Sequence, residues 1–239
     1  MQRSSALSRP SEAASATHVP QVRLSLAERR RSLIDAARRV FAEHGFRGAT
    51  TRQIAAAARV TEALIFQHFP HKDALYAAIL DERDAEPASE RWFAELDAHR
   101  AAGDAASVIR TLYTGLIELH EQDPDLIRLM AFSALEDHPL ARHLHRRATR
   151  LYGFLEGFIA DGQRRGQFRR GSASILARAT LALPIYYIQQ RHLFKMPWPP
   201  VKASDVIDEG VQFTLAGLTA SAGKQAARLA STVNLKVRS

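Results

Sequence analysis

The side chains best suited to chemistry fall in one short segment, residues 50–72. They offer hydroxyl, guanidinium, amide, imidazole and ammonium groups, with one carboxylate and several small or apolar neighbours. Such groups bind phosphate oxygens and the edges of bases. We therefore interpret the segment as a DNA contact. Its candidate residues are Thr50, Thr51, Arg52, Thr61, Glu62, Ala63, Leu64, Phe66, Gln67, His68 and Lys72.

Two helices of about eight residues, joined by about three, are expected to position these groups. Thr50 or Thr51 can cap the first helix, and Thr61 can cap the second, which should end before Pro70. Ala55 is small enough to let the two backbones approach closely. The pattern predicts a helix-turn-helix whose second helix fits a major groove about 12 Å wide.

The expected roles differ along the segment. The two threonines sit at a helix N-terminus, which favours phosphate. Arg52 should point outward, and His68 and Lys72 can hold the DNA backbone at the far end. For Glu62, a partner for the helix dipole is the preferred interpretation, with a base contact as the alternative.

Composition agrees with a polyanionic partner. The 239-residue chain has a net charge of +8, and residues 23–75 hold ten Arg or Lys against five acids. It has no cysteine, which excludes disulfides, thiol catalysis and cysteine zinc sites. We find no Gly-rich phosphate loop, nucleophile motif or metal-ligand pair, so we expect no enzyme, no cofactor and no metal. No apolar run is long enough to span a membrane.

The remaining sequence reads as one helix after another, so the fold class is all-α. Ser25 and Glu28 fit a capping box at the start of a helix of about 19 residues, which Gly45 should end. Later helices are expected over 105–121, from 124, over 140–165, over 172–194 with a kink at Pro184, and over 205–218. Residues 196–200 read as a rigid connector.

The composite pattern closely resembles the tetracycline-repressor (TetR) family. The matching pieces are Ala36-Ala37, Val40 to Phe46, Thr50-Thr51, Ile54-Ala55, Ala58, Val60-Thr61, Phe66 to Pro70 and Lys72 to Leu75. The resemblance implies a three-helix DNA-binding domain, a C-terminal domain of about six helices and a homodimer formed mainly by the last two. It assigns phosphate or backbone contacts to Thr51, His68 and Lys72, and groove-facing positions to Arg52, Glu62, Ala63, Leu64 and Gln67.

Some positions depart from the family pattern. Arg59 replaces the usual turn glycine, and Ala63 replaces a glycine of the recognition helix. Phe66 stands where a tyrosine is usual, and Leu64 where a small polar residue is common. A base sequence cannot therefore be transferred from relatives.

The expected domains are a disordered leader (1–24), a DNA-binding domain (25–71), a regulatory domain (72–220) and a basic tail (221–239). Candidate pocket residues are Tyr113, Leu116, His120, Met130, Phe132, Phe154, Phe158 and Tyr187. Candidate dimer residues, with core packing as the alternative, are Leu176, Ala179, Leu183, Ile207, Val211 and Leu218. The cluster His138, His143 and His145 is read as a solvated face rather than a metal site.

The resulting hypothesis is a cytoplasmic, nucleoid-associated repressor that leaves a palindromic operator when a small apolar or aromatic effector binds. An activator, or a regulator without a ligand, is the first alternative. A basic helical adaptor or membrane-surface protein is the second.

Overall fold

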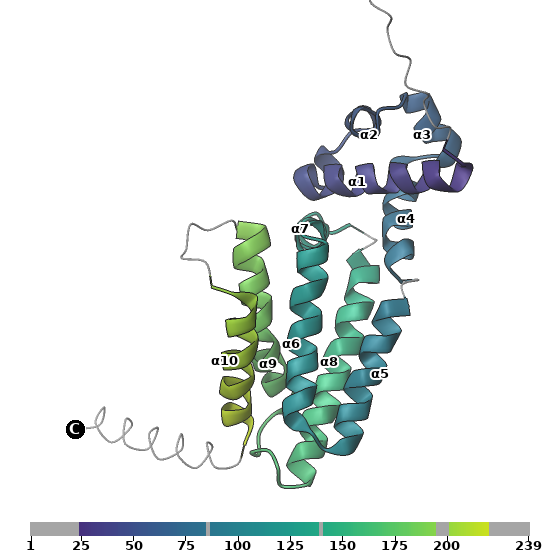
Figure 1. The fold of residues 1–239 in the computed structure, drawn as a ribbon. Coiled ribbons are helices and arrows are strands. Elements are labelled where there is room, and N and C mark those ends of the chain that lie inside the picture. The colour runs from purple at the N-terminus through teal and green to yellow at the C-terminus, as the bar shows by residue number, and fades with distance from the viewer. Residues whose placement is uncertain (1–23, 85–86, 139–140, 195–200, 220–239) are drawn as a thin grey trace, which may run out of the picture.

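The computed structural model describes residues 24–84, 87–138, 141–194 and 201–219, and the described chain is almost entirely helical (Figure 1). The N-terminal helices are α1 (Leu26–Gly48), α2 (Thr51–Ala58), α3 (Glu62–His68) and α4 (Lys72–Asp84). The others are α5 (Pro87–Ala102), α6 (Ala105–Gln122), α7 (Asp125–Leu135), α8 (Ala141–Arg164), α9 (Ala173–Ile188), the π-helical turn η1 (Gln189–Phe194) and α10 (Ala203–Leu218). The all-α prediction is confirmed. Within the described residues, β-type pairing is limited to one isolated antiparallel bridge between Phe168 and Thr219.

Short sequence motifs determine where α1 begins and where it bends. The Ser25 hydroxyl accepts the amide of Glu28, and the Glu28 carboxylate accepts the amide of Ser25, so the predicted capping box is present. Gly45 takes φ +72°, a conformation that suits glycine, and the chain turns there before three more residues reach Gly48. Gly45 therefore breaks the helix where the sequence predicts its end.

The molecule has two hydrophobic clusters, and α7 contributes to both. The N-terminal cluster unites α1 to α4 around Leu33, Phe41 and Ile65. α7 adds Leu129 to that cluster and Ile127 to the cluster of the bundle. In Figure 1, α1 lies across one end of the bundle with α7 directly beneath it. Through α7, the position of the N-terminal domain is tied to the packing of the bundle.

The division between domains is less simple than the sequence suggests. Lys72 begins α4, where the sequence analysis places the start of the second domain, yet Leu75, Tyr76 and Ile79 of this helix pack in the N-terminal cluster. We propose that the first half of α4 belongs structurally to the N-terminal domain. The expected leader to residue 23, the connector 196–200 and the tail 221–239 lie outside the described residues.

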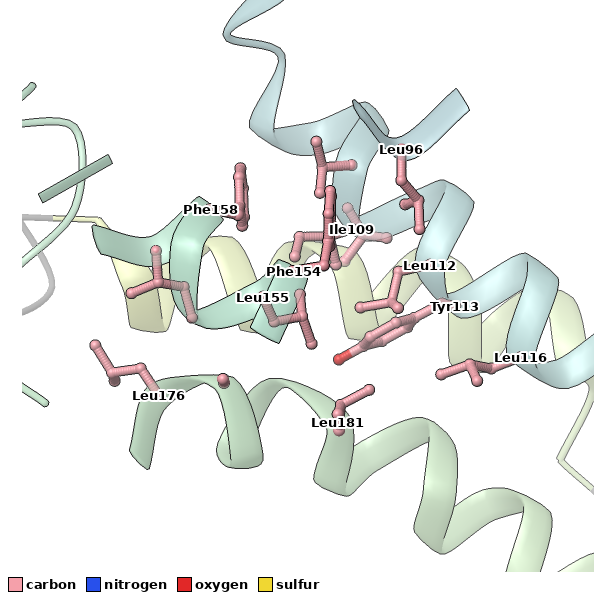
Figure 2. Packing of buried hydrophobic residues seen from close by; sticks show 14 of the residues in the cluster. Leu96, Ile109, Leu112, Tyr113, Leu116, Phe154, Leu155, Phe158, Leu176 and Leu181 are labelled. Atoms are coloured by element: carbon pink, nitrogen blue, oxygen red, sulfur yellow. The ribbon is translucent and has the colours of Figure 1, made fainter. Parts of the chain in front are cut away.

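The bundle consists of α5, α6, α8, α9 and α10, which run side by side (Figure 1). Figure 2 shows Leu112 and Tyr113 of α6, Leu155 of α8 and Leu181 of α9 pointing toward one another. All four side chains are almost fully buried. The segment 172–194, expected as one kinked helix, divides into α9 and η1, with Pro184 inside α9.

Candidate nucleic-acid interface

α2 begins with its own capping box. The Thr50 hydroxyl accepts the amide of Gln53, and the Gln53 side-chain oxygen accepts the amide of Thr50 at 2.8 Å. Ile54 and Ala55 are buried beneath the helix, whereas Arg52 is exposed. Thr50 therefore acts as the N-cap, and its hydroxyl is engaged within the chain rather than free for phosphate.

The turn between α2 and α3 depends on Arg59. This residue takes the left-handed conformation (φ 56°, ψ 47°), which glycine adopts at lower cost than arginine. Its amide is hydrogen-bonded to the end of α2, and the amide of Val60 bonds to the carbonyl of Ala55. The chain then reaches Thr61, whose hydroxyl accepts the amide of Leu64 and caps α3 as predicted.

α3 is anchored on one side and exposed on the other. Ile65 and Phe69 are buried in the N-terminal cluster, and the Arg30 guanidinium lies over the Phe69 ring at 4.4 Å. Ala63, Phe66 and Gln67 are exposed on the opposite side, and Phe66 keeps 48% of its surface accessible. Thr61 is also exposed, and Leu64 and His68 are half-buried. A short, firmly held helix therefore presents a surface of small, aromatic and amide side chains.

Thr51 and Lys72, which the sequence predicts to contact DNA, form hydrogen bonds within the chain. The Thr51 hydroxyl donates a 2.7 Å hydrogen bond to the Glu62 carboxylate, which joins the start of α2 to the start of α3. Glu62 lies in the first turn of α3, so the preferred interpretation as a dipole partner agrees with its position. The Lys72 ammonium donates to the carbonyls of Phe46 (2.6 Å) and Ala49 (2.9 Å), so it closes the end of α1 instead of pointing to solvent. We propose that this closing role replaces the contact with the DNA backbone that the sequence suggests for Lys72.

Known proteins share this arrangement. Residues 33–79 match the family model described as bacterial regulatory proteins, tetR family. The N-terminal domain of this chain is therefore similar to the DNA-binding domain of that family. The transcriptional repressor Rv1474c of Mycobacterium tuberculosis is 47% identical over 57 residues, 24% of this chain and 30% of the relative. This chain therefore spans less than a third of that relative's length.

Other known proteins match a larger part of the chain, but at lower sequence identity. The repressor NicS of Pseudomonas putida is 26% identical over 176 residues, which are 72% of this chain and 81% of NicS. The regulator KstR2 of Mycobacterium tuberculosis superposes with a TM-score of 0.62 at 19% identity, covering 82% of this chain and 97% of KstR2. AibR, solved with isovaleryl coenzyme A and operator DNA, has a TM-score of 0.58 at 19% identity over 78% of this chain and 97% of AibR. The structural likenesses establish a tetR-like fold.

A contact that the sequence analysis missed fixes the tetR-type domain to the bundle. The Glu136 carboxylate, at the end of α7, accepts hydrogen bonds from the amides of Phe46 (2.9 Å) and Arg47 (3.1 Å). A side chain at Gly45 would collide with Glu136 and Phe132. His138 packs on the same contact, with its ring 4.1 Å from that of Phe46. No local pattern predicts this pairing, because the residues are about ninety positions apart.

The predicted pocket residues do not gather on one surface. Tyr113, Leu116, His120, Phe154 and Phe158 are buried in the bundle, and Tyr187 is half-buried against it. Met130 and Phe132 are half-buried on α7. Phe132 lies against Gly45 at the contact with α1, so we remove it from the pocket set. The remaining set stays a prediction.

The predicted dimer face needs a similar correction. Leu176, Val211 and Leu218 are buried in the core of the single chain and have little surface left for a partner. Leu183 and Ile207 are half-buried, and Ala179 is exposed. The exposed apolar side chains of α9 and α10 belong to neighbouring positions on each helix. They are Ile175 (68% exposed), Ala179, Ala182, Tyr186 (51%), Phe213 (76%) and Ala216.

Two further expectations concern metals and membranes. The side chains of His143 and His145 lie outside the described residues, and His138 packs among aromatic rings. In the described part of the chain, no three metal-ligating side chains come together. Searching the same residues yields no helix with the length and apolarity needed to cross a membrane.

Proposed function

We propose that the chain is a DNA-binding transcriptional repressor that acts as a homodimer and leaves a palindromic operator when a small effector binds. The observation that carries the proposal is that α3 is buried on one side and exposed on the other. Ile65 and Phe69 fix the helix to its domain, and Phe66 and Gln67 are exposed, as is Arg52 of α2. A helix held in this way can enter a major groove and place its side chains against base edges.

The direct contacts are assigned from exposure. Gln67 can form paired hydrogen bonds with adenine, and Arg52 can bind guanine or phosphate. Phe66 and Ala63 can pack against the thymine methyl group. Thr61 is also exposed, and we assign its side chain a further contact with the DNA backbone in addition to its role as the cap of α3. We assign Thr51, Glu62 and Lys72 to holding the domain together, because their polar groups already bind within the chain.

The homodimer supplies the second recognition helix. The exposed side chains Ile175, Tyr186 and Phe213 form the apolar surface that we assign to the partner. Large exposed apolar patches commonly mark interaction sites. A two-fold dimer presents its helices to two related half-sites, so the operator should be palindromic. Such a protein would act in the cytoplasm on the chromosome, by binding rather than by catalysis.

Control by an effector rests on the connection between the bundle and the N-terminal domain. α7 packs in both clusters, and Glu136 holds the end of α1. An effector that favours one arrangement of the bundle would shift α7 and change the spacing of the two α3 helices. AibR was solved with both an acyl coenzyme A and operator DNA, and we propose that this chain also responds to a ligand with an apolar body.

Selection from random duplex DNA tests the proposal. The full-length protein should recover sites with two-fold symmetry. Gln67→Ala should relax the preference at one position of each half-site by a cost of about 1–3 kcal/mol per half-site. Gln167→Ala, an exposed glutamine just after α8 and outside the proposed dimer face, is the matched control and should recover the original site. Recovery of no sequence, together with tight binding to anionic vesicles, would favour the membrane-surface alternative.

A further inference from the structure

η1 is the irregular part of the bundle. It continues α9 as a π-helical turn over Gln189–Phe194 and packs against α7. π-helical turns are rare and occur frequently at functional sites. Ile188 at its start is fully buried, and Leu193 packs against the bundle core. One short segment therefore touches both the apolar core and the helix that contacts α1.

Polar groups are buried around this turn without protein partners. The Gln190 side-chain oxygen and the His192 Nε2 atom are shielded from solvent, and neither has a hydrogen-bond partner among the described residues. The Tyr187 hydroxyl is also shielded, and the Arg191 guanidinium is the polar group beside it. Buried polar groups in folded proteins are nearly always hydrogen-bonded, because leaving them unpaired is unfavourable. Two unpartnered groups on η1, with the Tyr187 hydroxyl three residues before the first of them, point to a partner that is not part of the bundle.

The charges at this location are balanced. The Arg191 guanidinium lies 3.6 Å from the Glu121 carboxylate of α6. Burial raises the pKa of the Tyr187 phenol, and Arg191 partly opposes that shift. Burial also lowers the pKa of His192, and the nearby Arg191 guanidinium lowers it further. Near neutral pH the segment therefore offers uncharged donors and acceptors beside an ion pair that is already satisfied.

We propose that the end of α9 and η1 form the polar part of a small-molecule site. The ligand class is an uncharged compound with one or two hydrogen-bonding groups, such as a ketone, hydroxyl or amide, on an apolar body. Tyr187 and His192 bind the polar group, and the apolar body lies against the partly buried side chain of Leu193. This inference rests on the proposed function, because it names the effector class and the helix that receives the signal.

The signal has a short route to the DNA-binding domain. A ligand bound at η1 would press on α7, which packs beside it. α7 carries Leu129 in the N-terminal cluster and ends at Glu136, which holds the amides of Phe46 and Arg47. One rigid helix therefore joins the proposed site to the end of α1.

Thermal unfolding of the full-length protein with eight-carbon probes tests the site. 2-Octanone and octanamide should raise the unfolding temperature, whereas octanoate and octylamine at the same concentrations should not. Tyr187→Phe and His192→Gln should each weaken the binding of octanamide by roughly tenfold, the loss expected for about one hydrogen bond. Tyr152→Phe, a half-buried tyrosine on α8, is the control and should bind octanamide as the unchanged protein does.

The outcomes separate this inference from the proposed function. If none of the uncharged probes stabilises the protein, or if octanoate or octylamine stabilises it more, the proposal is overturned. Equal binding by Tyr187→Phe, His192→Gln and the unchanged protein would also overturn it. If 2-octanone and octanamide bind as expected while the protein ignores all duplex DNA, the site stands and the proposed repressor function fails.

Discussion

The Tyr113 hydroxyl donates a 2.9 Å hydrogen bond to the carbonyl of Thr180. In a regular helix that carbonyl would accept the amide of residue 184, but residue 184 is a proline and has no amide hydrogen. The same hydroxyl lies 2.8 Å from the Thr214 hydroxyl of α10. Tyr113 of α6 thus supplies the hydrogen bond that Pro184 cannot donate within α9. Through the same hydroxyl it joins α6, α9 and α10.

Removal of this hydroxyl should destabilise the bundle. Tyr113→Phe leaves the Thr180 carbonyl buried without its partner, and we expect a loss of about 1–3 kcal/mol in the free energy of unfolding. Urea unfolding followed by circular dichroism measures it. Tyr152→Phe removes a hydroxyl from a half-buried tyrosine of α8, outside the proposed dimer face, and should change stability by less than about 0.5 kcal/mol. Equal stability of the two variants would show that the Thr180 carbonyl does not depend on Tyr113.

The bond between Tyr113 and Thr180 shows where sequence reasoning reaches its limit. The sequence predicts the caps at Ser25, Thr50 and Thr61 correctly, because each depends on residues three positions apart. Tyr113 was expected in a ligand pocket because its type suits one. Its actual partner lies 67 positions away, and no local pattern links the two.

At the candidate DNA interface, too, the sequence predicts some features and misses others. The exposure of Arg52 and Gln67 follows from helical periodicity. The inward direction of Lys72 does not, because it depends on the carbonyls that the turn at Gly45 leaves open nearby. Likewise, the amphipathic pattern of α9 and α10 identifies two apolar faces on each helix but does not decide which one the single chain buries.

The contact of Glu136 with α1 should control DNA affinity. Glu136→Ala removes the acceptor of two amides, so the N-terminal domain should lose its fixed orientation. We expect operator affinity to fall by about tenfold, a cost of about 1.4 kcal/mol, with unchanged sequence preference. Glu136→Gln keeps one oxygen acceptor and should show a smaller loss. Fluorescence anisotropy with labelled operator measures both, and wild-type affinity in Glu136→Ala would refute the role.

The exposed face of α9 and α10 should carry the dimer. Phe213→Glu places a charge on a side chain that is 76% exposed in the single chain but should be buried by the partner. Sedimentation should show a monomer at concentrations where the unchanged protein is a dimer. Ala94→Glu on α5, at the other side of the bundle, is the matched control and should stay dimeric. If Phe213→Glu remains a dimer, the partner binds elsewhere.

Acid should weaken the link between α5 and α8. The Arg100 guanidinium donates to the Asp161 carboxylate at 2.5 and 3.0 Å, and these hydrogen bonds lower the pKa of Asp161 below its usual range. The unfolded chain therefore binds the proton more readily. The stabilisation is complete above about pH 5 and disappears as the pH falls through the lowered pKa.

Asp161→Asn removes that titration. The variant should be less stable than the unchanged protein near pH 7, and the difference should shrink as the pH approaches about 2. Thermal midpoints across this pH interval measure the effect. A difference that stays constant with pH would show that the carboxylate charge contributes nothing to the link.

The most direct test of the central claim is a titration of the selected duplex with full-length protein at several salt concentrations. We expect two chains to bind each duplex, a log–log slope of affinity against salt that reflects several phosphate contacts, and clear preference over a scrambled duplex. Gln67→Ala should reduce that preference by about 1–3 kcal/mol per half-site while binding the scrambled duplex as before. Binding of one chain per duplex without preference, or no binding at low salt, would contradict the account.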